Sequence, residues 1–440
     1  MLVAYSVPSS VTAMAALPMA LFVPAFYADD LGVPLAAVGV AIACSRLLDV
    51  VTDPLIGGLS DRMHLPLGRR KPWMLLGAPL FLIALWKIFV PSEDVSAVYL
   101  ALWSAVLYLG FTLIDLPHKA WGAELSTDYD DRSRVTGWRE GIATAGQVTL
   151  LAAVVWLAAR GIEDAAGQLK AIAVVIVLTL PVLLLLCLTT VAEPIPGCFT
   201  HERRNTLAGL KIVARNPAFV RMVGCVLFFV SGVAIQGTLH RLVLADVMVE
   251  QGRFPIMILL ENLATLAGIP VWLAISVRIG KDRALMLAAL WIALWSLPLV
   301  FMRQGDVIAM MCVIVIRGSS FASILFLANS IAADVIDVDT LESGEQRSGL
   351  FFAVWGMTIK LSLALGVVLG TTLPAALGYD PSAESIGVVI QGHVMWVYGG
   401  VPALLMGLGA LFLYRFPLTR ARHAEVRAAL DSLSTPQHNT

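Results

Sequence analysis

The chain has 440 residues, of which 58% are hydrophobic and only 14% are charged, with a formal net charge of −1. A soluble domain averages about 25% charged residues, so this chain has too few to cover a water-facing surface. The small net charge, without a basic patch, argues against a nucleic-acid partner. Composition therefore indicates an integral membrane protein surrounded by the lipid bilayer.

Twelve apolar segments follow one another along the chain. Each is close to the roughly 20 residues that a helix needs to cross a bilayer. They lie near residues 5–28, 35–58, 73–91, 96–117, 137–159, 171–191, 218–243, 256–277, 284–302, 307–331, 349–372 and 394–415. The pattern predicts an all-α protein with twelve transmembrane helices.

One long polar segment, 192–217, divides these helices six and six. We expect an N-terminal six-helix bundle over 1–191, a cytoplasmic linker, a C-terminal bundle over 218–416, and a cytoplasmic tail over 417–440 that begins as an amphipathic helix. A glycine and a basic cluster follow both the second helix (GGLSDRMHLPLGRRKPW) and the eighth (AISVRIGKDRALM). This repetition predicts two related bundles with a site between them.

The basic residues of the loops indicate the orientation in the membrane. Most of them fall in alternate loops and in the tail, whereas the opposite loops hold only Arg160, Lys170, Arg253 and Arg303. Because cytoplasmic loops are enriched in Lys and Arg, we expect both termini in the cytoplasm. The expected location is a bacterial-type inner (plasma) membrane.

Arg317 lies in the middle of the tenth apolar segment and has no assigned role. Six further charged residues lie inside the apolar segments. They are Arg46, Asp49 and Asp53 in the second helix, Asp115 in the fourth, Arg139 in the fifth and Lys360 in the eleventh. At roughly 3 kcal/mol each, lipid exposure would cost about 18 kcal/mol in total, more than the roughly 5–15 kcal/mol that stabilises a typical fold. These three acids and three bases must therefore face the protein interior and neutralise one another.

Asp49 and Asp53 are four residues apart, so both carboxylates project from one helix face, with Arg46 one turn before Asp49. Two neighbouring carboxylates can share a proton or bind a small hard cation such as Na⁺. The alternative is a permanent ion-pair network that only holds helices together. The number of charges favours a functional site.

Other charged positions have simpler interpretations. His240, Arg241 and Glu261 lie near predicted helix ends, where we expect them to reach water. The acidic segment DVIDVDTLESGE after the tenth helix should be solvated, or should form a latch against basic loops of the other half.

Three blocks of sequence show a family resemblance. They are RLLDVVTDPLIGGLSDRMHLPLGRRKPWMLLGAP, IDLPHKAWGAELSTDYDDRSRVTGWRE and ADVIDVDTLESGEQRSGLFFAVWGMTIKLSLALG. Together they resemble the glycoside–pentoside–hexuronide:cation symporters, the melibiose-carrier branch of the major facilitator superfamily, and they span nearly the whole chain. The resemblance implies two six-helix bundles and cation-coupled symport by alternating access.

The resemblance also implies roles for individual residues. Asp49 and Asp53 match the acids that bind the coupling cation, and Thr112 falls where a threonine contributes to that site. Asp115 and Arg139 match residues that hydrogen-bond the sugar. Lys360 matches the lysine that couples the two halves, a role in which Arg46 can share.

Three departures from the family pattern keep the ion and the solute open. Thr52 stands where the melibiose carriers have asparagine, so the coupling ion is H⁺ or Na⁺. The first helix has Ala13 in place of a sugar-binding acid, and His118 and Lys119 follow Asp115 where an aromatic residue would stack on the sugar. A sugar or sugar acid is the first expectation, and a non-sugar anionic or lipid-like solute is the alternative.

Enzyme motifs are missing from the sequence. It has no H-E-x-x-H metal site, no G-x-S-x-G nucleophile elbow and no phosphate-binding GK[ST] loop. We therefore expect no enzymatic activity, no bound cofactor, and as partners only the solute, the coupling cation and the bilayer. A receptor or scaffold would have little use for six interior charges.

Overall fold

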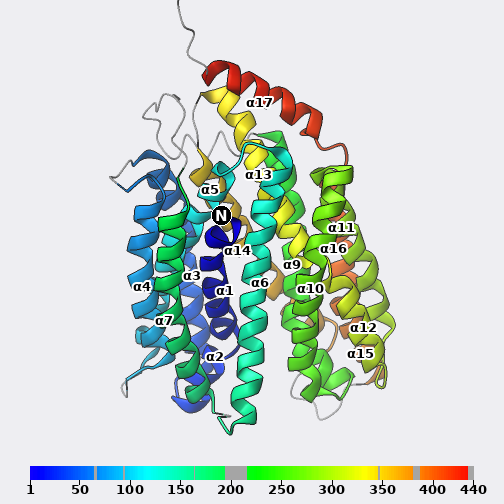
Figure 1. Ribbon diagram of the computed structural model, residues 1–440. Helices are drawn as coiled ribbons and strands as arrows, with labels where there is room; N and C mark the ends of the chain where they lie inside the picture. Colours follow the sequence, from blue (N-terminus) through cyan, green and yellow to red (C-terminus); the bar gives the residue numbers. More distant parts are fainter. Residues whose placement is uncertain are drawn as a thin grey trace, which may run out of the picture. The chain divides into compact units, whose positions relative to one another are not determined.

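The computed structural model describes residues 1–63, 67–92, 95–162, 164–193, 216–344, 347–379 and 387–434. Within these ranges the regular elements are all helices (Figure 1). Those of the first part of the chain are α1 (Leu2–Leu21), α2 (Val23–Ala25), η1 (Phe26–Asp30), α3 (Leu35–Arg62), α4 (Lys71–Phe89), α5 (Ala97–Glu124), α6 (Tyr129–Ala159) and α7 (Ala165–Thr190).

The second part of the chain continues in the same way. Its elements are α9 (Pro217–Leu242), η2 (Val243–Val247), η3 (Gln251–Arg253), α10 (Phe254–Ile279), α11 (Lys281–Ser296), η4 (Leu297–Phe301), α12 (Val307–Gly318), α13 (Phe321–Ser343), α14 (Ser348–Ala376), α15 (Val388–Met395), η5 (Trp396–Gly400), α16 (Val401–Phe412) and α17 (Arg420–Ser434).

Eleven segments of the described chain are long and apolar enough to cross a membrane. One of them, Val307–Ser343, joins α12 and α13 into a single span. Helix α3, with 28 residues, is long enough to be the twelfth. The all-α, twelve-helix prediction is confirmed.

The described residues group into two compact units. Unit 1 takes those within Met1–Ile212, Ile336–Met357 and Val426–Thr440, and unit 2 those within Val213–Val335 and Thr358–Glu425. Helices α13, α14 and α17 therefore each contribute to both units. The predicted division into bundles at 192–217 stays a prediction, because 194–215 lie outside the described residues.

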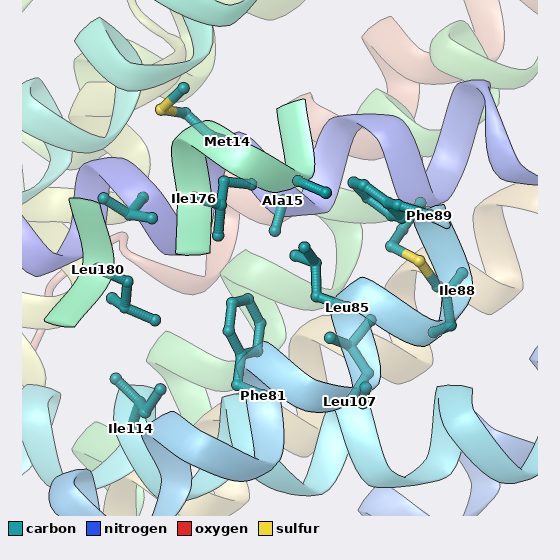
Figure 2. Close-up of a cluster of buried hydrophobic side chains, with 14 of the residues drawn as sticks. Met14, Ala15, Phe81, Leu85, Ile88, Phe89, Leu107, Ile114, Ile176 and Leu180 are labelled. Carbon is teal, nitrogen blue, oxygen red and sulfur yellow. The ribbon is translucent and has the colours of Figure 1, made fainter. Parts of the chain in front are cut away.

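The core of unit 1 is built from α1, α4, α5 and α7. Figure 2 shows its apolar side chains, with Ala15 from α1, Phe81 and Leu85 from α4, Leu107 from α5 and Ile176 from α7. Small residues let these helices approach closely, as is common where lipid rather than water surrounds a bundle. The apolar core fixes α5, which carries Thr112, Asp115, His118 and Lys119.

The core of unit 2 lies around α9, the end of α11 and the η5–α16 segment. Its buried apolar side chains include Leu239, Met257, Met310 and Tyr398. Ser231 of α9 donates a hydrogen bond from Oγ to the backbone carbonyl of Ser362 on α14, at 3.1 Å. These contacts hold α9 in place, and α9 carries polar residues discussed below.

Helix α13 extends well past the predicted end of the tenth segment, to Ser343. The acidic run is therefore helical at its start, and Asp334, Asp337 and Asp339 are buried. The expectation of a solvated acidic segment was wrong, because each of these acids has a basic partner. The amphipathic tail helix is confirmed as α17, and residues 435–440 lie outside the described residues.

Candidate functional site

Asp53 lies on α3 and is only 2% exposed. Its Oδ1 accepts a hydrogen bond from the Thr112 hydroxyl of α5, at 2.9 Å. The backbone of α14 also comes close, since a Cβ built on Gly356 would lie 3.5 Å from Asp53 Oδ2. Pro54 inside α3 has no N–H, so the carbonyl of residue 50 lacks its usual helical donor. A hydroxyl oxygen therefore lies against a buried carboxylate, and both are ligand types that a small hard cation prefers.

Three more predicted ion-site residues lie on the same helix. Thr52 precedes Asp53, and its buried Oγ1 has no hydrogen-bond partner among the described residues. Asp49 and Arg46 lie one and two turns earlier on α3. Their side chains are outside the described set, so their place beside Asp53 stays a prediction.

A second group of charges lies one turn further along α5. Lys119 Nζ is 2.6 Å from Asp115 Oδ2, a pair whose four-residue spacing belongs to one helix face. Arg139 of α6 places Nη2 3.6 Å from Asp115 Oδ1 and 3.2 Å from Glu140 Oε1. Arg139 Nε has no hydrogen-bond partner among the described residues. The group offers carboxylate acceptors and cationic donors, the pairing that a polyhydroxylated solute needs.

His118 faces a different neighbour from Lys119. Its Nε2 lies 2.7 Å from the Tyr5 carbonyl, and the Tyr5 hydroxyl donates to the His118 carbonyl at 2.8 Å. A carbonyl only accepts, so Nε2 carries the proton. The imidazole also contacts the Tyr5 ring, with centroids 4.3 Å apart and the ring planes tilted by 41°. His118 therefore joins α5 to α1, and its predicted contact with the solute stays a prediction.

Lys360, predicted to couple the two halves, is half-buried on α14 and belongs to unit 2. Asp53 belongs to unit 1. Their predicted pairing stays a prediction.

A network centred on Arg70 was missed by the sequence-based site prediction. The Arg70 guanidinium lies 2.7 Å from Asp61 Oδ1 and 2.8 Å from Glu124 Oε1, and it also donates to Ser348. Asp61 accepts hydrogen bonds from the backbone N–H groups of Gly349 and Leu350, at 2.8 and 3.0 Å. Burial alone would lower the pKa of Arg70, but the two carboxylates outweigh it and raise that pKa above its ordinary value.

The Arg70 network had a signal in the sequence. The basic loop after the second helix was used only to orient the chain, although burying an arginine requires nearby acids. Asp61 also caps the first turn of α14, where unpaired N–H groups favour a negative charge. The loop is therefore part of the packed structure of unit 1.

The acids of the α13 segment have partners within their own units. Arg132 contacts both oxygens of Asp337, at 2.7 and 3.1 Å, within unit 1. Lys281 Nζ lies 2.6 Å from Asp334 Oδ2 within unit 2. Arg132 lies in the first turn of α6, and Lys281 is the first residue of α11. The predicted latch against basic loops of the other half stays a prediction, because each of these pairs lies within one unit.

Unit 2 holds a further charged cluster. Arg317 Nη2 lies 2.9 Å from Glu261 Oε1, and His240 Nδ1 lies 2.6 Å from the Tyr398 hydroxyl. His240 and Arg317 are buried. His240 is buried against Tyr398 and Phe254, so the expectation that it reaches water was wrong. Glu261 pairs with Arg317 and keeps 16% of its side chain exposed. Arg241, by contrast, is exposed.

The chain matches the family described as "MFS/sugar transport protein" over residues 4–420. It belongs to that family. The family match agrees with the twelve-helix fold and with the resemblance seen in the three sequence blocks. This protein is therefore a multi-pass membrane transporter with the major facilitator fold.

Individual relatives cover nearly the whole chain. The glucuronide carrier protein homolog of Escherichia coli is 23% identical, covering 94% of this chain and 91% of its own. The putative glycoside/cation symporter YagG of Escherichia coli is 25% identical, covering 90% and 87%. The sodium-dependent lysophosphatidylcholine symporter 1 of Xenopus tropicalis is 22% identical, covering 93% and 85%.

A solved structure agrees on the fold. The proton:xylose symporter XylE matches with a TM-score of 0.70 over 97% of each chain, at 13% sequence identity. At this identity the match shows the fold alone.

Proposed function

We propose that this transporter couples the inward or outward movement of H⁺ or Na⁺ to symport of a sugar or sugar acid by alternating access. Both termini would face the cytoplasm of a bacterial-type inner membrane. The observation that carries the proposal is the arrangement along α5. Thr112 holds the buried Asp53, and one helical turn later Asp115 begins the group with Lys119 and Arg139.

This arrangement can link ion binding to solute binding. Binding of a proton or a cation would neutralise the charge of the buried Asp53 carboxylate. The helix rises about 5.4 Å per turn, which keeps Thr112 and Asp115 within strong electrostatic range. Neutralising Asp53 therefore changes the field at Asp115, Lys119 and Arg139. The loaded state then differs in energy from the empty one, as alternating access requires.

The solute class follows from the second group. Asp115 accepts hydrogen bonds from sugar hydroxyls, while Lys119 and Arg139 donate to ring and hydroxyl oxygens or to a carboxylate. Two relatives of this chain are named for glucuronide and glycoside transport. A sugar acid has hydroxyl groups that can bind Asp115 and a carboxylate that can bind Lys119 and Arg139.

The test is uptake and counterflow in proteoliposomes, with and without imposed proton or sodium gradients. The named variant is Asp53→Asn, and the control is Asp131→Asn, which removes an exposed acid on the first turn of α6. We expect Asp53→Asn to lose gradient-driven accumulation, at least about 100-fold, as for a group needed in every cycle. Solute movement that ignores both gradients in the wild type rules out the coupling.

A lipid-like solute is the second candidate. It is favoured by the absence of any Asp, Glu, His, Lys or Arg in α1, which removes one polar group from the expected sugar site, and by the relative named for lysophosphatidylcholine. Counterflow of a labelled lysophospholipid, measured beside labelled glucuronide, decides between them. Movement of the lipid alone replaces the sugar proposal.

A further inference from the structure

The cluster around Arg317 in unit 2 has no part in the function proposed above. Arg317 ends α12 and is 3% exposed. Its Nη2 donates to Glu261 Oε1 of α10 at 2.9 Å, and its Nη1 donates to Gln236 Oε1 of α9. Gln236 Nε2 in turn donates to Ser296 Oγ of α11 at 3.3 Å. Four helices of unit 2 therefore converge on one guanidinium.

The acid is held firmly against this guanidinium. A Cβ built on Gly318 would lie 3.1 Å from Glu261 Cγ and 3.2 Å from its carbonyl oxygen, so α10 and α12 are in close contact there. The Thr265 hydroxyl also donates to the Gly318 carbonyl at 2.8 Å. These close contacts leave the Arg317–Glu261 pair little freedom to separate. If the net charge of the pair changes, another charged group must therefore compensate for it.

Two buried nitrogen atoms of the cluster have no hydrogen-bond partner among the described residues. They are Arg317 Nε and His240 Nε2. His240 is 4% exposed, and its Nδ1 lies 2.6 Å from the Tyr398 hydroxyl. When that hydroxyl donates to Nδ1, the proton of the neutral ring is on Nε2. Buried donors without acceptors cost about 1–3 kcal/mol each, so an additional acceptor would stabilise the cluster formed by the described residues.

The net charge of the Arg317 cluster determines when such an acceptor can bind there. The titratable groups around Glu261 are Arg317 from α12, His240 from α9 and Tyr398 from η5, with neutral Gln236 and Ser296 completing the surroundings. With Glu261 ionised, and with His240 and Tyr398 neutral, the cluster has no net charge. Once Glu261 takes a proton, the guanidinium is left as an uncompensated positive charge in a poorly solvated place.

We propose that Glu261 and Arg317 form a proton-gated anion site in unit 2, and that its ligand is the carboxylate of a sugar acid. A proton binds the Glu261 carboxylate and makes it a neutral acid. The Arg317 guanidinium, whose planar fork suits a carboxylate, then binds the solute anion with help from His240 Nε2–H. One proton and one anionic group enter and leave together, which keeps the net charge of the cluster at zero.

This inference rests on the proposed function, because it takes a sugar acid as the solute. It adds that acidic solutes bring a proton to unit 2, separately from the ion at Asp53. Neutral glycosides have no group for this site and should not depend on it.

The experiment compares two probes that differ only in the carboxylate, 4-nitrophenyl β-D-glucuronide and 4-nitrophenyl β-D-glucoside. Binding and counterflow are measured on the full-length carrier in proteoliposomes. We expect Arg317→Gln to weaken glucuronide binding about 100-fold, equivalent to about 2.8 kcal/mol, and to change glucoside transport less than about twofold. Arg317→Lys should restore part of the glucuronide binding, which also reports that the carrier folds.

Glu261→Gln tests the proton step, because glutamine imitates the protonated acid. In the wild type, glucuronide binding should weaken as the pH rises, by about tenfold per pH unit once Glu261 is mostly ionised. In Glu261→Gln it should be strong and nearly independent of pH. The control Glu250→Gln, an exposed acid just before α10, should keep the wild-type profile.

Each outcome has one meaning. Equal loss of both probes in Arg317→Gln, unchanged glucuronide binding, or an unchanged pH profile in Glu261→Gln overturns the inference and leaves symport through Asp53 standing. A carrier that moves neither probe overturns the inference together with the sugar proposal.

Discussion

The polar groups of the two units are organised in opposite ways. In unit 1, the side chains proposed to bind the ion and the solute are separate. Asp53 of α3 and Thr112 of α5 lie at one level, and Asp115 and Lys119 of α5 lie one helical turn further with Arg139 of α6. In unit 2, the proposed anion site uses one acid and one base, Glu261 and Arg317. With separate groups, ion binding and solute binding can change independently. With a shared pair, the binding of one proton is coupled to the binding of one anion.

The largest expected effect is the removal of Arg139. Its guanidinium is buried between Asp115 and Glu140, so Arg139→Gln leaves two buried acids without this partner, a loss of about 3–5 kcal/mol. Binding of the glucuronide and the glucoside should fall together, by at least about 100-fold. Equilibrium binding to the purified carrier measures this loss.

The matched control for Arg139 is Arg134→Gln, on the same helix. Arg134 is exposed and pairs only with Asp131 in the contacts described, at 2.8 Å, so we expect no measurable change. If Arg139→Gln weakened the glucuronide alone, the distinction between the two units would disappear.

The second prediction concerns the close helix–helix contacts at Gly57 in unit 1 and at Gly318 in unit 2. A Cβ on Gly57 of α3 would lie 2.5 Å from the Gly349 carbonyl of α14, against 3.1 Å for the nearest contact at Gly318 in unit 2. Gly57→Ala should therefore lower the thermal stability of the carrier more than Gly318→Ala. For an overpacked position we expect about 1–3 kcal/mol.

The control for Gly57 lies on the same helix. Gly39 has open space around its Cβ position, so Gly39→Ala should keep or slightly raise the melting temperature, because alanine favours the helix. Thermal unfolding in detergent, followed by tryptophan fluorescence, ranks the three variants. A melting temperature for Gly318→Ala below that of Gly57→Ala contradicts the ranking.

The parts of this protein that sequence could predict are those whose signal is local. Hydropathy over about 20 residues locates the helices, and the four-residue spacing of Asp115 and Lys119 already places them on one face. The Arg317–Glu261 pair joins residues 56 positions apart, and no local pattern reports it. Without a visible partner, Glu261 was expected in water, and Arg317 had no role.

The prediction that the acidic run of α13 is solvated was wrong for the same reason. Asp334 and Asp337 look solvated in sequence because their partners, Lys281 of α11 and Arg132 of α6, are distant in the chain. A buried charge is favourable only when a partner is present, and pairing is a property of the fold. Charged residues at predicted helix ends are therefore the positions where sequence alone is least informative.

The smallest expected effect is the change in stability caused by Thr52→Val. The direction of this change is more informative than its size. The Thr52 hydroxyl is buried without a hydrogen-bond partner among the described residues, so replacing it with the isosteric valine should raise stability by up to about 1 kcal/mol. If that hydroxyl is kept to complete the cation site beside Asp53, Thr52→Val should at the same time weaken sodium or proton stimulation of uptake several-fold.

A structural hydroxyl and a ligand hydroxyl can be distinguished by measuring the melting temperature and the ion dependence together. Loss of a structural hydroxyl lowers the melting temperature and leaves ion dependence unchanged, whereas loss of a ligand keeps or raises the melting temperature and weakens ion dependence. Measuring both on Thr52→Val, with Thr149→Val on exposed surface of α6 as the control, separates the two roles. A weaker sodium response with an unchanged proton response further assigns the ion at Asp53 as Na⁺, because a proton needs only the carboxylate and Na⁺ needs several oxygen ligands.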